Sequence, residues 1–112
     1  MGRKGDKMNF EKLLDFVNLE DKRLRNLYGN YPDEEKRILA RMVKLTEEVG
    51  ELSEEVLSHL KLQRKEKIQS NKNELSNEFA DVIITTLLLA KSLRVDIKEA
   101  LNDKIKIINE RY

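Results

Sequence analysis

The stretch between residues 38 and 60 carries one continuous hydrophobic stripe, which constrains the fold more than any other feature of the chain. The apolar residues that form it recur at steps of three or four positions. They are Ile38, Met42, Leu45, Val49, Leu52, Val56 and Leu60. Such spacing places them along one side of an α-helix, because an α-helix turns once in about 3.6 residues. The sequence therefore predicts one long helix with a single buried face.

Helical periodicity continues through the rest of the chain, and no segment shows the alternation that is typical of a strand. The expected helices cover residues 10–28, 34–62, 73–93 and 97–111. Asn9, Asp33 and Asp96 are the expected N-caps, since such side chains accept hydrogen bonds from first-turn amides. Residues 63–72 concentrate charge and turn-forming residues, which predicts a connector between the second and third helices.

These elements predict an all-α fold, an antiparallel four-helix bundle-like domain at residues 9–112 that follows a flexible leader at residues 1–8. The third helix is unusual because it is apolar nearly all round from Val82 to Ala90. A helix of that kind is buried on all sides, and a four-helix domain of this size can hardly bury one helix completely. We therefore expect the domain to oligomerise through the third helix.

The composition excludes several kinds of chemistry. The chain has no Cys and one His, His59, so it cannot form a thiolate metal site, a disulfide or a multi-His metal site. Its net charge of +1 gives no general reason to expect nucleic acid as a partner. No apolar run approaches the roughly 20 residues of a membrane span, and the charged N-terminus does not resemble a signal peptide. These features predict a cytoplasmic protein with no membrane partner.

Four acidic residues form two pairs, each with a spacing of three positions in a different predicted helix. Glu48 and Glu51 flank the hydrophobic stripe of the second helix, and Glu78 and Asp81 lie on the matching flank of the third. In an antiparallel hairpin of these helices, Glu48 faces Asp81 and Glu51 faces Glu78. Four carboxylates are then expected to converge at one level. The other acids of this part of the second helix are expected to face water: Glu47, Glu54 and Glu55.

Converging carboxylates repel one another and raise one another's pKa values unless a cation lies between them. Oxygen ligands without His or Cys suit Mg²⁺, with Mn²⁺ as a possible substitute, better than Zn²⁺. Because Mg²⁺ is commonly shared with substrate phosphates, the cluster predicts phosphate chemistry. Gly50 lies among these acids, and glycine inside a helix costs about 1 kcal/mol relative to alanine. We therefore expect a packed helix or a ligand close to Gly50.

Two segments carry a resemblance to a known family. The sequences KLTEEVGEL at 44–52 and ELSNEFADVIITTLLLA at 74–90 resemble the MazG-like all-α nucleoside triphosphate pyrophosphohydrolases. The family's signature is Glu-x-x-Glu, a spacer and Glu-x-x-Asp, which here reads Glu48-x-x-Glu51, 26 residues, and Glu78-x-x-Asp81. The resemblance extends over residues 33–112. It implies a helical bundle that forms a homodimer or homotetramer.

The resemblance also implies a function for individual residues. Glu48, Glu51, Glu78 and Asp81 would be the metal ligands and catalytic residues for hydrolysis of a nucleoside triphosphate to the monophosphate and pyrophosphate. The residues that would contact the substrate are Lys44, Lys104, Asn109 and Arg111. The family commonly separates its tail Lys and Asn by four positions, whereas Lys104 and Asn109 are five apart, so Lys106 is an alternative to Lys104.

The leading interpretation is an enzyme that removes non-canonical or excess nucleotides. Three other functions are alternatives to it. Phosphoribosyl-ATP pyrophosphatase of histidine biosynthesis has the same fold and a similar acidic pattern. A non-catalytic helical module that binds nucleotide or a protein partner is a second alternative, and it predicts that Glu51→Gln leaves function intact. A nucleic-acid-binding module is a third, and its sign would be strongly salt-dependent binding to DNA or RNA.

Overall fold

A computed structural model of the chain describes residues 7–27, 33–61 and 72–112. This part of the chain forms four α-helices and contains no strand, which confirms the predicted all-α class. The helices are α1 (Phe10–Leu27), α2 (Glu34–His59), α3 (Lys72–Ser92) and α4 (Ile97–Asn109). Most of the predicted connector and of the predicted leader lies outside the described residues.

Three helices begin where the sequence predicts, because each has a side-chain cap. Asn9 Oδ1 accepts a hydrogen bond of 2.9 Å from the Lys12 amide at the start of α1. Asp33 Oδ1 accepts one of 2.9 Å from the Glu35 amide before α2. Asp96 Oδ1 accepts one of 3.0 Å from the amide of Glu99 before α4. These bonds satisfy amides that have no partner inside their own helix.

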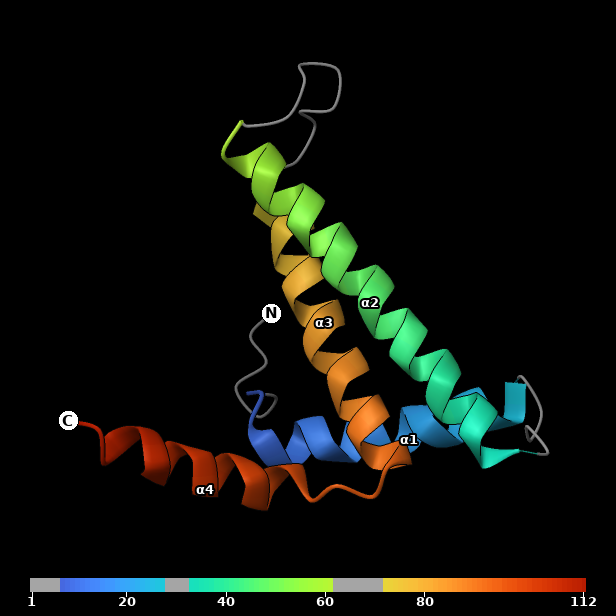
Figure 1. Ribbon diagram of the computed structural model, residues 1–112. Helices are drawn as coiled ribbons and strands as arrows, with labels where there is room; N and C mark the ends of the chain where they lie inside the picture. Colours follow the sequence, from blue (N-terminus) through green and yellow to red (C-terminus); the bar gives the residue numbers. More distant parts are fainter. Residues whose placement is uncertain (1–6, 28–32, 62–71) are drawn as a thin grey trace.

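The long helices α2 and α3 form an antiparallel hairpin, α1 crosses one end of it, and α4 leads away from that end (Figure 1). The buried apolar core is small and lies where α1 meets α3. It consists of Val17 on α1 with Leu87 and Leu88 on α3. Helix α1 therefore packs on α3 at one end of the α2–α3 hairpin.

A buried polar network joins the three helices beside this core. Arg41 of α2 forms an ion pair of 2.8 Å with Asp21 of α1, and it donates hydrogen bonds to Ser92 Oγ at 2.7 Å and the Leu88 carbonyl at 3.1 Å. Asp21 and Arg41 are 4% and 8% exposed. Removal of one partner of a buried ion pair leaves the other charge uncompensated, so this network fixes the position of α1 on the hairpin.

Three of the seven residues of the predicted stripe are exposed: Met42, Val49 and Leu60. The neighbouring Arg41 is buried and pairs with Asp21. The expectation of a close neighbour at Gly50 is wrong within one chain, since a Cβ at this position would meet no atom within 4 Å. Both corrections have the same cause: this side of α2 has no helix packed on it among the described residues.

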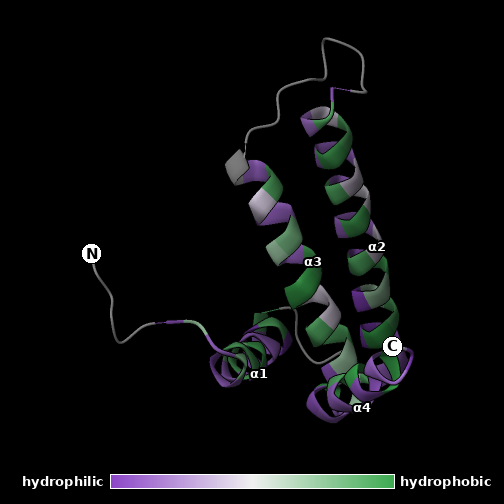
Figure 2. Ribbon diagram, turned by 90° about the vertical axis from the view of Figure 1, so that its left-hand side faces the viewer, coloured by the Kyte–Doolittle hydropathy of each residue, from purple (hydrophilic) through white to green (hydrophobic). Residues whose placement is uncertain are grey.

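A single chain leaves much apolar surface uncovered. Phe79 and Ile83 on α3 are about half exposed, and α4 has no buried residue. Figure 2 shows hydrophobic segments along the visible faces of α2 and α3.

None of the described helices combines the length and the apolar character that crossing a membrane requires.

Candidate metal centre

Three carboxylates meet between α2 and α3, about halfway along the hairpin. Glu48 of α2 and Glu78 and Asp81 of α3 each offer one oxygen, and these three atoms lie within 4.8 Å of one another. Glu48 is buried, Glu78 is half-buried and Asp81 is exposed. The group therefore has one side in the hairpin and one side open, as a site that exchanges ligands with solvent requires.

Glu51, the fourth predicted member, lies beside these three without joining their group of ligand atoms. Its side chain is exposed, and its negative charge raises the pKa values of Glu48 and Glu78. The hairpin thus brings Glu51 close to the other three acids, with its carboxylate at the solvent side.

Glu55 was expected to face water, and for one of its oxygens this is wrong. Glu55 is half-buried, and its Oε1 is buried with no hydrogen-bond partner. Its charge also acts on Glu78. The helical spacing contains the signal for this position, because Glu55 projects from α2 in a direction between those of Glu48 and Glu51.

The environment raises the pKa of two members of the cluster above the ordinary value of 4.5. Burial is the main cause for Glu48, followed by the charge of Glu51, while Lys44 acts in the opposite direction. Burial is also the main cause for Glu78, followed by the charges of Glu51 and Asp81. Both shifts have the sign that is expected when carboxylates share a site without enough positive charge.

The residues fit a hard divalent cation. Glu78 Oε1 is buried and has no hydrogen-bond partner, so an acceptor inside the cluster is left unsatisfied. All of the atoms that could bind a metal ion here are carboxylate oxygens, the ligand type that Mg²⁺ and Mn²⁺ prefer. Glu48, Glu78 and Asp81 would hold the cation, and Glu51 lies beside them.

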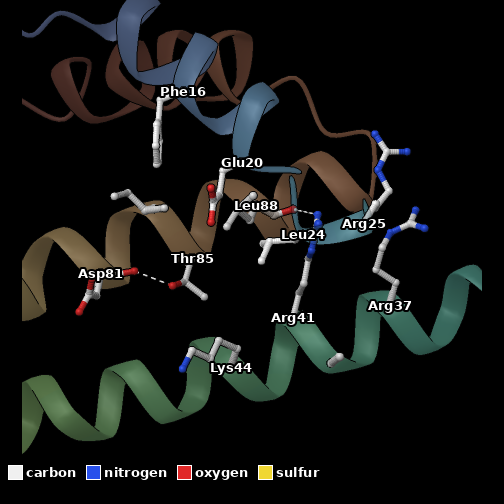
Figure 3. Close-up of a pocket in the computed structure, with 12 residues that line it drawn as sticks. Phe16, Glu20, Leu24, Arg25, Arg37, Arg41, Lys44, Asp81, Thr85 and Leu88 are labelled. Carbon is white, nitrogen blue, oxygen red and sulfur yellow. Dashed lines mark hydrogen bonds between the residues drawn. The ribbon is translucent and has the colours of Figure 1, made fainter. Parts of the chain in front are cut away.

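A cavity of about 510 Å³ adjoins the cluster and is bounded by α1, α2 and α3. Figure 3 shows Phe16 and Glu20 of α1 directed into it from one side and Lys44 of α2 from the opposite side. Asp81 lies at one end, so one member of the acidic group also belongs to the wall of this cavity. Its lining also includes the apolar residues Leu24, Ala40, Ile84 and Leu88.

The predicted substrate contacts divide into two groups. Lys44 lines the cavity, and its Nζ lies 3.6 Å from Glu48 Oε2 and 3.8 Å from Glu47 Oε1. Lys104, Asn109 and Arg111 are exposed on and after α4 and do not line this cavity. Within one chain, the structure therefore brings Lys44 to the acidic group and leaves the tail residues apart from it.

An α-helical hairpin with an acidic centre between its two helices defines this protein as an all-α domain with a candidate divalent-cation site. The model of the MazG-like family matches residues 39–112, which include α2 from Leu39 onward, α3 and α4. The chain therefore belongs to the MazG-like family. No curated protein and no solved structure matched the chain in the same comparisons.

Proposed function

We propose that this protein is a metal-dependent nucleotide pyrophosphohydrolase that converts a nucleoside triphosphate into the monophosphate and pyrophosphate. The observation that carries the proposal is the group of three carboxylates, contributed by two facing helices and open to a cavity. Membership of the MazG-like family supports a pyrophosphatase-like domain in general. Mg²⁺ is the expected cation and Mn²⁺ the expected substitute. A nucleotide substrate also makes the cytoplasm the expected place of action.

The reaction adds water across the bond between the α-phosphorus and the oxygen that bridges to the β-phosphate. A bound Mg²⁺ would offset the charge of the phosphate oxygens and lower the pKa of a bound water. Glu51 is exposed beside the cluster, so its carboxylate is available to accept the proton that the attacking water loses. Lys44 adds positive charge next to Glu48, where the phosphates would lie.

A second copy of the chain is part of the proposal. Half-exposed apolar side chains on α3 and α4 of one chain, among them Phe79, Ile83 and Ile105, offer a surface for it. We propose that a second copy covers this surface in a homodimer or homotetramer. Lys104, Asn109 and Arg111 lie on or just after α4, which leads away from the hairpin, and we propose that they contact the phosphates held by a neighbouring copy.

Product analysis tests this function. The protein is incubated with Mg²⁺ and a panel of canonical and modified nucleoside triphosphates, and pyrophosphate is separated from orthophosphate. The proposal predicts monophosphate and pyrophosphate, with loss of both in EDTA and in the Glu51→Gln variant. Release of orthophosphate would place cleavage at another bond. No hydrolysis of any nucleotide, with Mg²⁺ bound, would favour the non-catalytic binding module.

A further inference from the structure

We propose that Phe16 and Glu20 of α1 bind the base of the substrate and make guanine the preferred base. The inference rests on the proposed function, because it names the substrate of that same site. Both side chains are directed into the cavity that adjoins the three carboxylates (Figure 3). They are four positions apart, so they lie one turn apart on one face of α1. Helix α1 lies outside residues 39–112, so the family match assigns no role to either of them.

The cavity lies where the base of a bound nucleotide is expected. Asp81 is at one end of it and belongs to the acidic group that would hold the cation and the phosphates. Thr85 and Leu88 on its wall follow Asp81 by four and seven positions, which is about 6 and 10 Å along the axis of α3. Figure 3 shows the Glu20 carboxylate between Thr85 and Leu88. One sugar separates a base from its α-phosphate, so a base at this level leaves the α-phosphate near Asp81.

Phe16 supplies a surface on which a base can stack. It lines the cavity and is 38% exposed, although a large aromatic side chain gains by leaving water. Every base has a flat π-face, so stacking on an aromatic ring strengthens the binding of any base and does not select among them. The choice of base must therefore come from a polar group of the same wall.

The carboxylate of Glu20 has capacity for further hydrogen bonds. Its side chain is 28% exposed, and its Oε1 makes a long contact of 3.5 Å with the solvated Arg23. The basic side chains that line the cavity form ion pairs with other carboxylates of the described chain: Arg25 and Arg41 with Asp21, Arg37 with Glu34, and Lys44 with Glu47 and Glu48. Glu34 also pairs with Arg94. Glu20 therefore faces the cavity as an acceptor that can receive donors from a ligand.

A carboxylate distinguishes the bases by their donors, because it accepts hydrogen bonds and donates none. Guanine presents two adjacent donors, N1–H and the N2 amino group, which match the two oxygens of one carboxylate. Adenine and cytosine present an amino group beside a ring nitrogen that is an acceptor. Uracil and thymine present one N–H between two carbonyls. With these four bases an acceptor comes to face a carboxylate oxygen, which costs binding energy. The Glu20 carboxylate therefore favours guanine.

Selectivity among triphosphates tests this assignment, with kcat/KM for pyrophosphate release measured from GTP, ITP and ATP. ITP differs from GTP by the absence of the N2 amino group, so it loses one of the two hydrogen bonds. The wild type should prefer GTP to ITP by at least about 10-fold, and Glu20→Gln should reduce that ratio to about 2-fold or less. Phe16→Ala should lower kcat/KM by a similar factor for all three. Asp15→Asn removes an exposed charge of α1 that does not line the cavity and should keep the wild-type ratio.

Binding of the unreactive monophosphates GMP and IMP, measured by calorimetry in Mg²⁺, separates this inference from the proposed function. A preference for GMP that Glu20→Gln removes, without pyrophosphate release from any triphosphate, would support the base site and contradict the enzyme. Equal kcat/KM for GTP and ITP, or a GTP preference that is unchanged in Glu20→Gln, would overturn the base assignment while the enzyme stands. Absence of GMP binding together with absence of hydrolysis would overturn both.

Discussion

Glu78→Gln should stabilise the metal-free protein at neutral pH, although it removes a side chain from the candidate metal centre. The Glu78 carboxylate lies within 4.8 Å of ligand oxygens of Glu48 and Asp81. At that separation two negative charges repel each other by about 0.9 kcal/mol in a water-like dielectric, and by more where the site is buried. Because Asp81 is exposed, we use the lower figure for both pairs. The expected gain in the free energy of unfolding is about 2 kcal/mol.

The pH dependence of this gain follows from the raised pKa of Glu78. Because the folded protein holds this proton more tightly than the unfolded chain does, the ionised carboxylate destabilises the fold above its raised pKa. The destabilisation decreases as the pH falls through that pKa toward the ordinary value of 4.5. The advantage of Glu78→Gln over the wild type should therefore be largest near pH 7.5 and disappear near pH 4.

Urea unfolding in EDTA at several pH values measures this difference. Glu47→Gln is the matched control, since it removes an exposed carboxylate on α2 that is outside the group of three. The reasoning is refuted if Glu78→Gln destabilises the metal-free protein at pH 7.5, or if its effect equals that of Glu47→Gln at every pH.

Three further predictions concern the rest of the fold, and urea unfolding measures each of them. Arg41→Met removes the more buried of the two arginines that pair with Asp21, along with its hydrogen bonds to Ser92 and Leu88, and should cost about 1.5–3 kcal/mol; a loss below about 1 kcal/mol would show that the network is not structural. Gly50→Ala should stabilise α2 by about 1 kcal/mol, because a Cβ meets open space, and a clear loss would mean that another molecule packs there. Asp33→Ala removes the N-cap of α2 and should cost about 1 kcal/mol, whereas an unchanged stability would contradict the capping role.

Local features made part of this structure predictable. The starts of α1, α2 and α4 depend on single capping side chains, at Asn9, Asp33 and Asp96, and the first turn that follows each of them. The meeting of Glu48 with Asp81 depends only on helical periodicity and an antiparallel hairpin. Neither requires knowledge of how distant parts of the chain pack, so the sequence is sufficient for both.

The polar network was missed although the sequence contains a signal for it. Asp21 lies on the apolar side of α1 between Val17 and Leu24, and Arg41 lies at the edge of the stripe on α2. Opposite charges on two otherwise apolar helix faces indicate a buried ion pair, which the periodicity of apolar residues alone does not reveal.

The direction of α4 could not be predicted because its own pattern does not determine its neighbour. Leu101, Ile105 and Ile108 form an apolar side that is expected to be buried, yet they are 44%, 53% and 41% exposed. Amphipathic spacing shows that a helix has a face to bury, and it does not show whether the same chain or another copy covers that face.

Binding of Mn²⁺, followed by electron paramagnetic resonance, tests the central claim most directly, because the claim is that Glu48, Glu78 and Asp81 hold a divalent cation. We expect saturable binding to the wild type and to Glu47→Gln, and at least about 10-fold weaker binding to Glu78→Gln. Added Mg²⁺ should displace the Mn²⁺ bound to the wild type. Absence of binding to the wild type, or equal binding to Glu78→Gln, would contradict the assignment of this cluster as a metal centre.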